Sequence, residues 1–222
     1  MTQLAEKKET AATRRRQDAL KRATDVVLSL ALIFVMAPLL LSLWLLVRWT
    51  SAGPALFRQE RLGRDQRRFT VLKFRTMYVD NDDRIHREYV ASLFSANGAA
   101  AAAGNGLYKL DADPRVTRLG AWLRRSSLDE LPQLVNVLRG EMSLVGPRPV
   151  LPWEAQLFAE PYQRRFAVKP GMTGLWQVSG RSRLSMRTAL DLDVEYVVRR
   201  SFALDVVILA RTLPAVFRGG AS

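Results

Sequence analysis

RRSSLDELPQLVNVLRGEMSLVGPRP, residues 124–149, is the stretch around which the chain is organised. It contains two adjacent carboxylates, Asp129 and Glu130, with arginines on both sides. It ends in Gly146-Pro147-Arg148-Pro149, which is a rigid turn because proline fixes the backbone φ angle. Acidic and basic side chains at this density indicate a site for a charged substrate.

A structural interpretation of the same acids competes with this one. Ser127-Leu128-Asp129-Glu130 fits a helix capping box, and carboxylates in a first helical turn oppose the helix dipole favourably. Pro132 would then fall inside the helix, where proline disrupts hydrogen bonding. A helix that begins near Pro132 and ends at Gly140 would instead leave both acids beside its amino terminus, where anions bind readily. Capping and catalysis are compatible, and both stay open at this point.

Composition limits the classes of function. The chain has 222 residues and a net charge of +13, which favours anionic partners such as phospholipid headgroups, nucleic acid or phosphorylated metabolites. It has no cysteine and a single histidine, His86. A disulfide framework, thiolate chemistry and a zinc centre of His and Cys ligands are therefore excluded. A bound metal would be a hard cation held by carboxylate and phosphate oxygens.

An apolar run from Val26 to Val47 follows the basic amino-terminal segment. As a helix rising about 1.5 Å per residue it reaches roughly 33 Å, enough to cross a bilayer core of about 30 Å. Residues 1–25 and 48–73 each carry seven Lys and Arg, which favours a cytoplasmic location for both ends. Pro38 lies in the middle, at a cost to a helix of about 3 kcal/mol. These residues alone leave a straight span and a re-entrant hairpin as alternatives.

The rest of the chain predicts an α+β fold, mostly α. Ala55 to Arg61 and Arg68 to Phe74 alternate apolar with polar residues and predict a β-hairpin. Val116 to Arg125 has an apolar face edged with arginine, which suits a membrane-surface helix or a core helix equally. Residues 95–106 are of low complexity and predict a flexible surface insertion. The predicted organisation is a disordered basic tail over 1–22, a membrane helix over 23–50 and a catalytic domain with interfacial helices over 51–222.

Several polar residues have a structural and a functional interpretation. Lys73 and Arg75 are either solvated edge-strand charges or a pair that faces phosphate. Asp193 and Tyr196 share one face of a helix predicted over Ser185 to Arg200, which suits a structural hydrogen bond or a substrate contact. The apolar segment Phe202 to Phe217 is short and contains charges, so it is expected to pack or lie at the interface.

A carboxylate among arginines suits phosphoryl chemistry. Aspartate has a reference pKa of about 3.9, so it is ionised without help from a base. A diphosphate repels it, and arginines with a divalent cation must offset that repulsion. Arg124, Arg148 and Arg181 are available, and their planar guanidinium groups match phosphate oxygens.

A series of motifs resembles those of the monotopic phosphoglycosyl transferases, the bacterial sugar transferase family. These are the apolar segment with its central Pro38 and, in order, the peptides FRQER (57–61), KFRTM (73–77), DPRVT (113–117), SLDELPQL (127–134), NVLRG (136–140), MSLVGPRP (142–149), KPGMTG (169–174) and QVSGR (177–181). Together they cover roughly residues 20 to 217. The resemblance implies transfer of a sugar 1-phosphate from a UDP-sugar to a polyprenyl phosphate, usually undecaprenyl phosphate. This is the first membrane step of surface glycan assembly.

The resemblance also implies roles for individual residues. Asp129 would be the nucleophile that forms a covalent phosphosugar intermediate and releases UMP, with Glu130 as its partner in proton handling or positioning. Mg²⁺ would bind near Asp129 and the diphosphate. The residues expected to face phosphate are Lys73, Arg75, Arg124, Arg148 and Arg181.

The implied topology is a re-entrant helix broken at Pro38, with both ends on the cytoplasmic face of the bacterial inner membrane. Many relatives have Ser-Pro where this chain has Ala37-Pro38. The chain resembles the short, catalytic-domain-only form, since about 25 residues upstream leave no room for further membrane helices. We expect a UDP-hexose such as UDP-glucose or UDP-galactose as donor, from overall resemblance to members that initiate exopolysaccharide synthesis. Membrane lipids are further expected partners, and homo-oligomerisation stays open.

Two alternatives compete with this prediction. In the first, the lipid phosphate attacks directly and the acids act only on Mg²⁺. In the second, the chain is a membrane-tethered basic module that binds an anionic polymer without catalysis. Its aromatic residues are not interleaved with the basic runs as stacking platforms for single strands would be, so nucleic acid is not an expected partner.

Overall fold

The computed structural model describes residues 2–79, 84, 87, 88, 91, 113–180 and 184–218, with side chains from Arg16 onward except at residues 213 and 215–218. The predicted insertion at 95–106, together with His86 and Arg181, lies outside these described residues. The described chain is mostly helical with two small sheets, which confirms the predicted α+β class.

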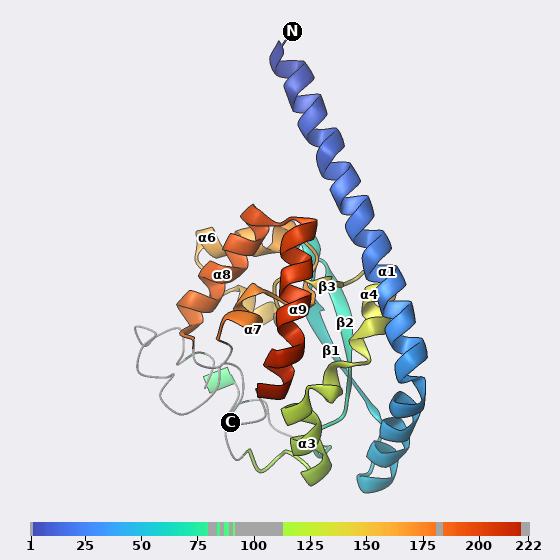
Figure 1. The fold of residues 1–222 in the computed structure, drawn as a ribbon. Coiled ribbons are helices and arrows are strands. Elements are labelled where there is room, and N and C mark those ends of the chain that lie inside the picture. The colour runs from blue at the N-terminus through green and yellow to red at the C-terminus, as the bar shows by residue number, and fades with distance from the viewer. Residues whose placement is uncertain are drawn as a thin grey trace.

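The longest element is helix α1, Thr2–Thr50, whose first turns project away from the rest of the molecule (Figure 1). The helical backbone begins at Thr2, within the segment for which the sequence predicts a disordered basic tail over residues 1–22. The physical reason is composition, because this segment is rich in Ala, Glu, Lys and Arg, which are strong helix formers. Its helix continues without a break into the apolar run.

Pro38 lies inside α1, and the helix continues on both sides of it. Figure 1 shows that the lower part of α1 changes direction toward α3, Arg118–Ser126, as expected where a proline removes a hydrogen bond. Among the described helices, only the part of α1 from Arg16 to Thr50 is long and apolar enough to cross a membrane. Its apolar side chains, such as Phe34, are largely exposed, which indicates membrane association. A re-entrant course stays a prediction.

Polar residues at the start of the apolar run attach α1 to the rest of the fold. The Arg22 guanidinium donates to the carbonyl of Leu138 at 2.7 Å, at the end of helix α4, Gln133–Arg139. The buried Asp25 carboxylate accepts from the Leu144 amide at 3.1 Å, in strand β3, Ser143–Val145. The basic amino-terminal segment therefore serves as a docking contact as well as a membrane flank.

The predicted hairpin is confirmed. Strands β1, Leu56–Leu62, and β2, Arg68–Phe74, pair antiparallel, with the short turn η1, Arg64–Gln66, between them. The buried Asn136 side chain of α4 donates to Thr70 O at 2.7 Å and accepts from the Leu72 amide at 3.0 Å. These two bonds fix the hairpin against α4.

A second sheet was not predicted. β3 pairs parallel with strand β4, Gly171–Thr173, which lies within the KPGMTG peptide. The two backbones approach so closely that a Cβ atom on Gly171 would lie 2.1 Å from the Gly146 nitrogen. Three residues per strand give no period-2 pattern to read, so the sequence carried no strand signal here.

The remaining described elements are helices, from three-residue 3-10 turns to the 17-residue α9. The predicted helix start at Ser185 is confirmed, because its hydroxyl accepts from the Thr188 amide at 3.1 Å. The elements are η2, Leu128–Glu130, α5, Pro152–Ala155, α6, Glu160–Gln163, η3, Arg164–Ala167, α7, Leu175–Ser179, α8, Met186–Arg199, and α9, Phe202–Arg218.

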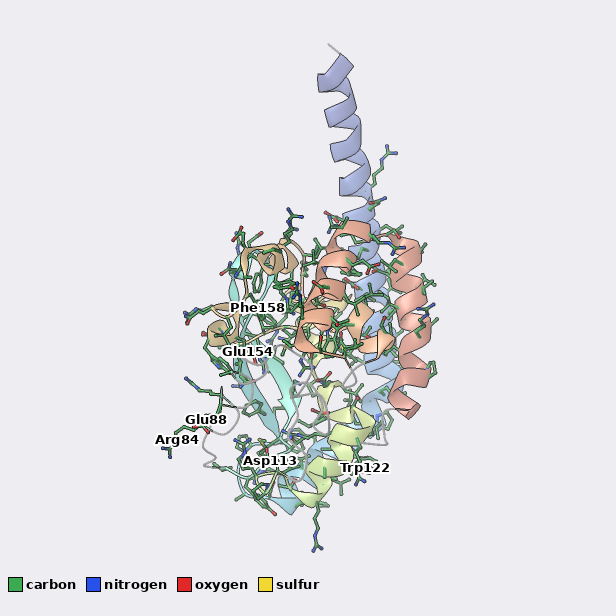
Figure 2. All side chains as sticks on the ribbon, turned by 90° about the vertical axis from the view of Figure 1, so that its left-hand side faces the viewer. Arg84, Glu88, Asp113, Trp122, Glu154 and Phe158 are labelled. Carbon is green, nitrogen blue, oxygen red and sulfur yellow. The ribbon has the colours of Figure 1, made fainter. Side chains whose placement is uncertain are left out.

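The buried apolar side chains form separate clusters along the length of the molecule. Figure 2 shows Glu154 and Phe158 on one part and Asp113 and Trp122 at the α3 end. At that end Leu123 is fully buried against α1, whereas the neighbouring Trp122 is 46% exposed. Helix α3 therefore packs in the core by one face and leaves an aromatic side chain free for an interface.

Candidate active site

The two adjacent carboxylates lie in η2, between α3 and α4. Ser127 has a φ of 57°, in the left-handed region, and its amide donates to Arg124 O as α3 ends. Its side chain makes no capping bond, so the capping-box interpretation is not realised. Helix α4 begins after Pro132 and ends at Gly140, whose φ is 79°, as the alternative interpretation predicted. Asp129 and Glu130 thus stand just before a helix amino terminus.

Glu130 is the centre of an acid–base cluster drawn from three elements. Lys73 Nζ, from β2, donates to Glu130 Oε1 at 2.6 Å. Arg148 Nη1, from the turn after β3, lies 3.6 Å from the same oxygen. These three side chains are 20–24% exposed, so a substrate can reach them. We call Lys73, Glu130 and Arg148 the open cluster.

Asp129 faces a different cation. It is 9% exposed, and its carboxylate interacts electrostatically with Arg124. Burial lowers the pKa of Arg124, and the nearby Asp129 and Asp113 carboxylates oppose that shift. The group nevertheless stays cationic, since guanidinium does not lose its proton in proteins. A cation beside the predicted nucleophile therefore comes from the last turn of α3.

Thr76 orients Arg124 and was not singled out from the sequence. Arg124 Nε donates to Thr76 Oγ1 at 2.9 Å. The Thr76 backbone lies against α3, where a Cβ atom on Gly120 would come within 2.0 Å of Thr76 O. The only available signal was the place of Thr76 within the KFRTM peptide, because a lone threonine has no distinctive spacing.

Arg75 contacts the end of α1 and not the two acids. Its side chain is buried, and Nη2 donates to Ser51 O at 2.8 Å and to Ser51 Oγ at 2.9 Å. These contacts hold the end of α1 against the hairpin. The structure therefore brings together Lys73, Arg148, Arg124 and the two acids, but it does not bring Arg75 to them. The fifth predicted cation, Arg181, lies outside the described residues.

A shallow cleft opens beside the open cluster. Arg61, Gln133 and Gln177 also line it, and sequence reasoning gave them no role, although each lies within a quoted motif. The full lining is Arg61, Val71, Lys73, Glu130, Gln133, Arg148, Pro149, Gly171, Met172 and Gln177. The cleft combines cations with amide groups, which suits a phosphorylated polar ligand.

The described residues contain no group of three or more His, Cys, Asp or Glu side chains that could hold a metal ion by themselves. The site has two carboxylates, of which Glu130 is paired with Lys73 and Asp129 lies beside Arg124. Mg²⁺ commonly takes one or two carboxylates together with substrate phosphates. The residues present therefore fit Mg²⁺ that binds together with a diphosphate.

Comparison with known proteins decides the family. A family model described as bacterial sugar transferase matches residues 16–219. The chain belongs to the bacterial sugar transferase family. The transferase is 42% identical over 196 residues to the exopolysaccharide production protein ExoY of Sinorhizobium fredii, covering 88% of this chain and 84% of that protein.

Two further relatives are longer than this chain. The transferase is 39% identical over 199 residues to the undecaprenyl-phosphate galactose phosphotransferase of Salmonella typhimurium. It is 38% identical over 208 residues to the UDP-glucose:undecaprenyl-phosphate glucose-1-phosphate transferase of Escherichia coli. In both pairs the match covers 90% of this chain and 40% of the relative. These relatives agree with an enzyme of the phosphoglycosyl transferase type and not with a non-catalytic binding module.

Proposed function

We propose that the transferase moves a sugar 1-phosphate from a UDP-hexose to undecaprenyl phosphate, releasing UMP and starting an exopolysaccharide or another surface glycan. The observation that carries the proposal is the open cluster beside Asp129 and Arg124, at a cleft of suitable polarity. The printed names of the relatives support it, since they include glucose and galactose phosphotransferases that use undecaprenyl phosphate.

The proposed reaction has two displacements at one phosphorus atom. First, a carboxylate oxygen of Asp129 attacks the sugar-linked phosphorus, and the bond from that phosphorus to the UMP oxygen breaks. Second, a phosphate oxygen of undecaprenyl phosphate attacks the same phosphorus, and the bond to Asp129 breaks. Asp129 is regenerated, so the chain is unchanged after one cycle. No base is needed to ionise the nucleophile.

The remaining site residues reduce charge repulsion in this proposal. Arg148, Lys73 and Arg124 would face phosphate oxygens, where cations stabilise the charge that spreads in the transition state. Glu130 would hold the Lys73 and Arg148 side chains in position and keep them from pairing with Asp129. Its contacts to both cations support this role. Arg181 stays a predicted phosphate contact, whereas the buried Arg75 side chain would reach phosphate only if it left Ser51. Mg²⁺, held by Asp129 and the substrate, would neutralise charge on the diphosphate.

The membrane helix would bring the site to its lipid substrate. We propose that α1 inserts its exposed apolar side chains into the bacterial inner membrane and that the catalytic domain stands on the cytoplasmic face. The equal numbers of Lys and Arg on both flanks of the apolar run support this placement. UDP-sugars would then reach the cleft from the cytoplasm.

The proposal is tested by UMP release from UDP-glucose, UDP-galactose and their N-acetylated counterparts, with undecaprenyl phosphate and Mg²⁺. We expect turnover with at least one hexose donor. Reactions without lipid acceptor separate the two displacements from direct attack by the lipid phosphate, because only the former releases one equivalent of UMP without acceptor. Absence of turnover with every nucleotide sugar would contradict the proposed function.

A further inference from the structure

Four consecutive backbone carbonyls in the turn that carries Arg148 are each bound by a different donor. The donors come from β4, η3 and β1, which are distant in the sequence. The bonds are Gly171 N to Pro147 O at 2.8 Å, Arg165 Nη2 to Arg148 O at 2.8 Å, Arg61 Nη1 to Pro149 O at 3.2 Å and Leu62 N to Val150 O at 2.9 Å. The turn is therefore fixed along its whole backbone.

The donor to Arg148 is one half of a buried ion pair. Arg165 Nη2 also lies 2.8 Å from Asp193 Oδ2, and the two side chains are only 2–3% exposed. The Arg165 guanidinium lies 4.9 Å from the centre of the Phe158 ring, so it is enclosed on its apolar side as well. We call Arg165 and Asp193 the buried pair. It is too enclosed to touch a substrate.

The buried pair is a poor device for stability alone. Arg165 Nη1 and Asp193 Oδ1 are buried and have no hydrogen-bond partner within the described parts of the chain. Burying charge that is incompletely bonded is costly, and a well-packed apolar pair often serves stability as well or better. What an apolar pair could not supply is the hydrogen bond to the Arg148 carbonyl.

We propose that Arg165 and Asp193 are positioning residues of the transferase. Asp193 orients the Arg165 guanidinium, which fixes the Arg148 backbone so that the Arg148 side chain points at Glu130 and at the donor phosphate. The inference rests on the proposed function in one respect, the role of Arg148 toward phosphate. The same logic extends to Arg61, which holds the next carbonyl and lies 3.7 Å from the buried Glu154 carboxylate.

The main test replaces both members of the buried pair at once. In Arg165→Met/Asp193→Leu no buried charge is left unpaired, so we expect the melting temperature to stay close to that of the wild type. We expect kcat/KM for UMP release to fall about 10- to 100-fold, because small displacements of a positioned group have effects of this size. The matched control is Lys21→Met/Asp205→Leu, which removes the ion pair between α1 and α9 and the Asp205 contact with the Tyr196 hydroxyl, but none of the four bonds to the Arg148 turn.

A double-mutant cycle separates positioning from general damage. If the buried pair acts through Arg148, the double replacement costs no further activity in an Arg148→Ala background. A purely structural role predicts the same fold-loss in both backgrounds. Arg165→Lys, which keeps the charge and one possible donor, should retain part of the activity and serves if the double replacement does not fold.

Hydrogen–deuterium exchange provides a readout that needs no turnover. Peptides covering residues 146–151 should exchange faster in Arg165→Met/Asp193→Leu than in the wild type. In the Lys21→Met/Asp205→Leu control their exchange rate should equal that of the wild type. If the wild type releases no UMP, the proposed function fails, and this exchange experiment still tests the fixing of the turn. Unchanged exchange and activity within about twofold of the wild type would overturn the inference.

Discussion

The open cluster and the buried pair both combine a carboxylate with basic side chains, and both contact Arg148. The Arg148 side chain faces Glu130, whereas the Arg148 carbonyl accepts from Arg165. The side chains of the open cluster are 20–24% exposed, whereas those of the buried pair are 2–3% exposed. Acid–base composition therefore does not identify a substrate site by itself. Access separates groups that can meet a phosphate from groups that can only hold others in place.

The largest expected effect is the loss of activity in a variant of Asp129, compared with the same change at Asp193. Asp129→Asn removes the proposed nucleophile, and we expect UMP release to fall on the order of 10³-fold or more, as for other enzymes that lose their nucleophile. Asp193→Asn is the matched control, since it makes the same chemical change at a position that is 2% exposed, compared with 9% for Asp129. It should lose activity only in part. Equal losses in the two variants would show that access does not separate the roles.

A second effect concerns the metal. Removal of divalent cations with EDTA should lower UMP release by about 10²-fold, because the diphosphate then keeps the charge that repels Asp129. Added Mg²⁺ should restore the activity, whereas a monovalent salt of equal ionic strength should not. Hydrogen exchange at residues 146–151 should not change on chelation, since the turn is held by protein groups alone. Full activity in EDTA would contradict the proposed role of Mg²⁺.

The smallest effect concerns the charge of the buried pair. Burial raises the pKa of Asp193 to about 6, against the opposing influence of Arg165 and Arg148. Between about pH 5 and pH 7 the native state loses a proton that the unfolded state has already lost, so stability falls as pH rises. The expected change is about 1 kcal/mol, or about 2–4 °C in melting temperature. Thermal unfolding of the wild type and Asp193→Asn at both pH values measures it. An identical slope in the two proteins would contradict the assignment.

The sequence predicted the parts of the fold that have local signals. The hairpin alternates apolar and polar residues, and α4 lies between Pro132 and Gly140, so both were found. The parallel pairing of β3 and β4 was missed because it joins three-residue segments far apart in the chain. The charge of residues 1–22 favours solvation and a disordered tail, whereas their helix propensity favours the helical backbone that α1 has from Thr2 onward.

For the site too, the sequence predicted the residues that have a local signal and missed the contacts that do not. Asp129, Glu130 and Arg148 lie in one dense stretch, and Lys73 was found through its motif. The sequence alone permits a structural or a substrate role for Asp193, and its ion pair with Arg165 favours the structural role. Nothing local in the sequence pairs Arg165 with Asp193 or with the Arg148 carbonyl, because these contacts exist only after the chain has folded.

The central claim is that Asp129 forms a covalent bond to the phosphosugar. The most direct measurement is mass spectrometry of the transferase incubated with its UDP-sugar and Mg²⁺ but without undecaprenyl phosphate, followed by peptide mapping. We predict one hexose phosphate per chain on the peptide that contains Asp129, lost when undecaprenyl phosphate is added and absent from Asp129→Asn. An unmodified chain, with UMP released only when the acceptor is present, would contradict the account and favour direct attack by the lipid phosphate.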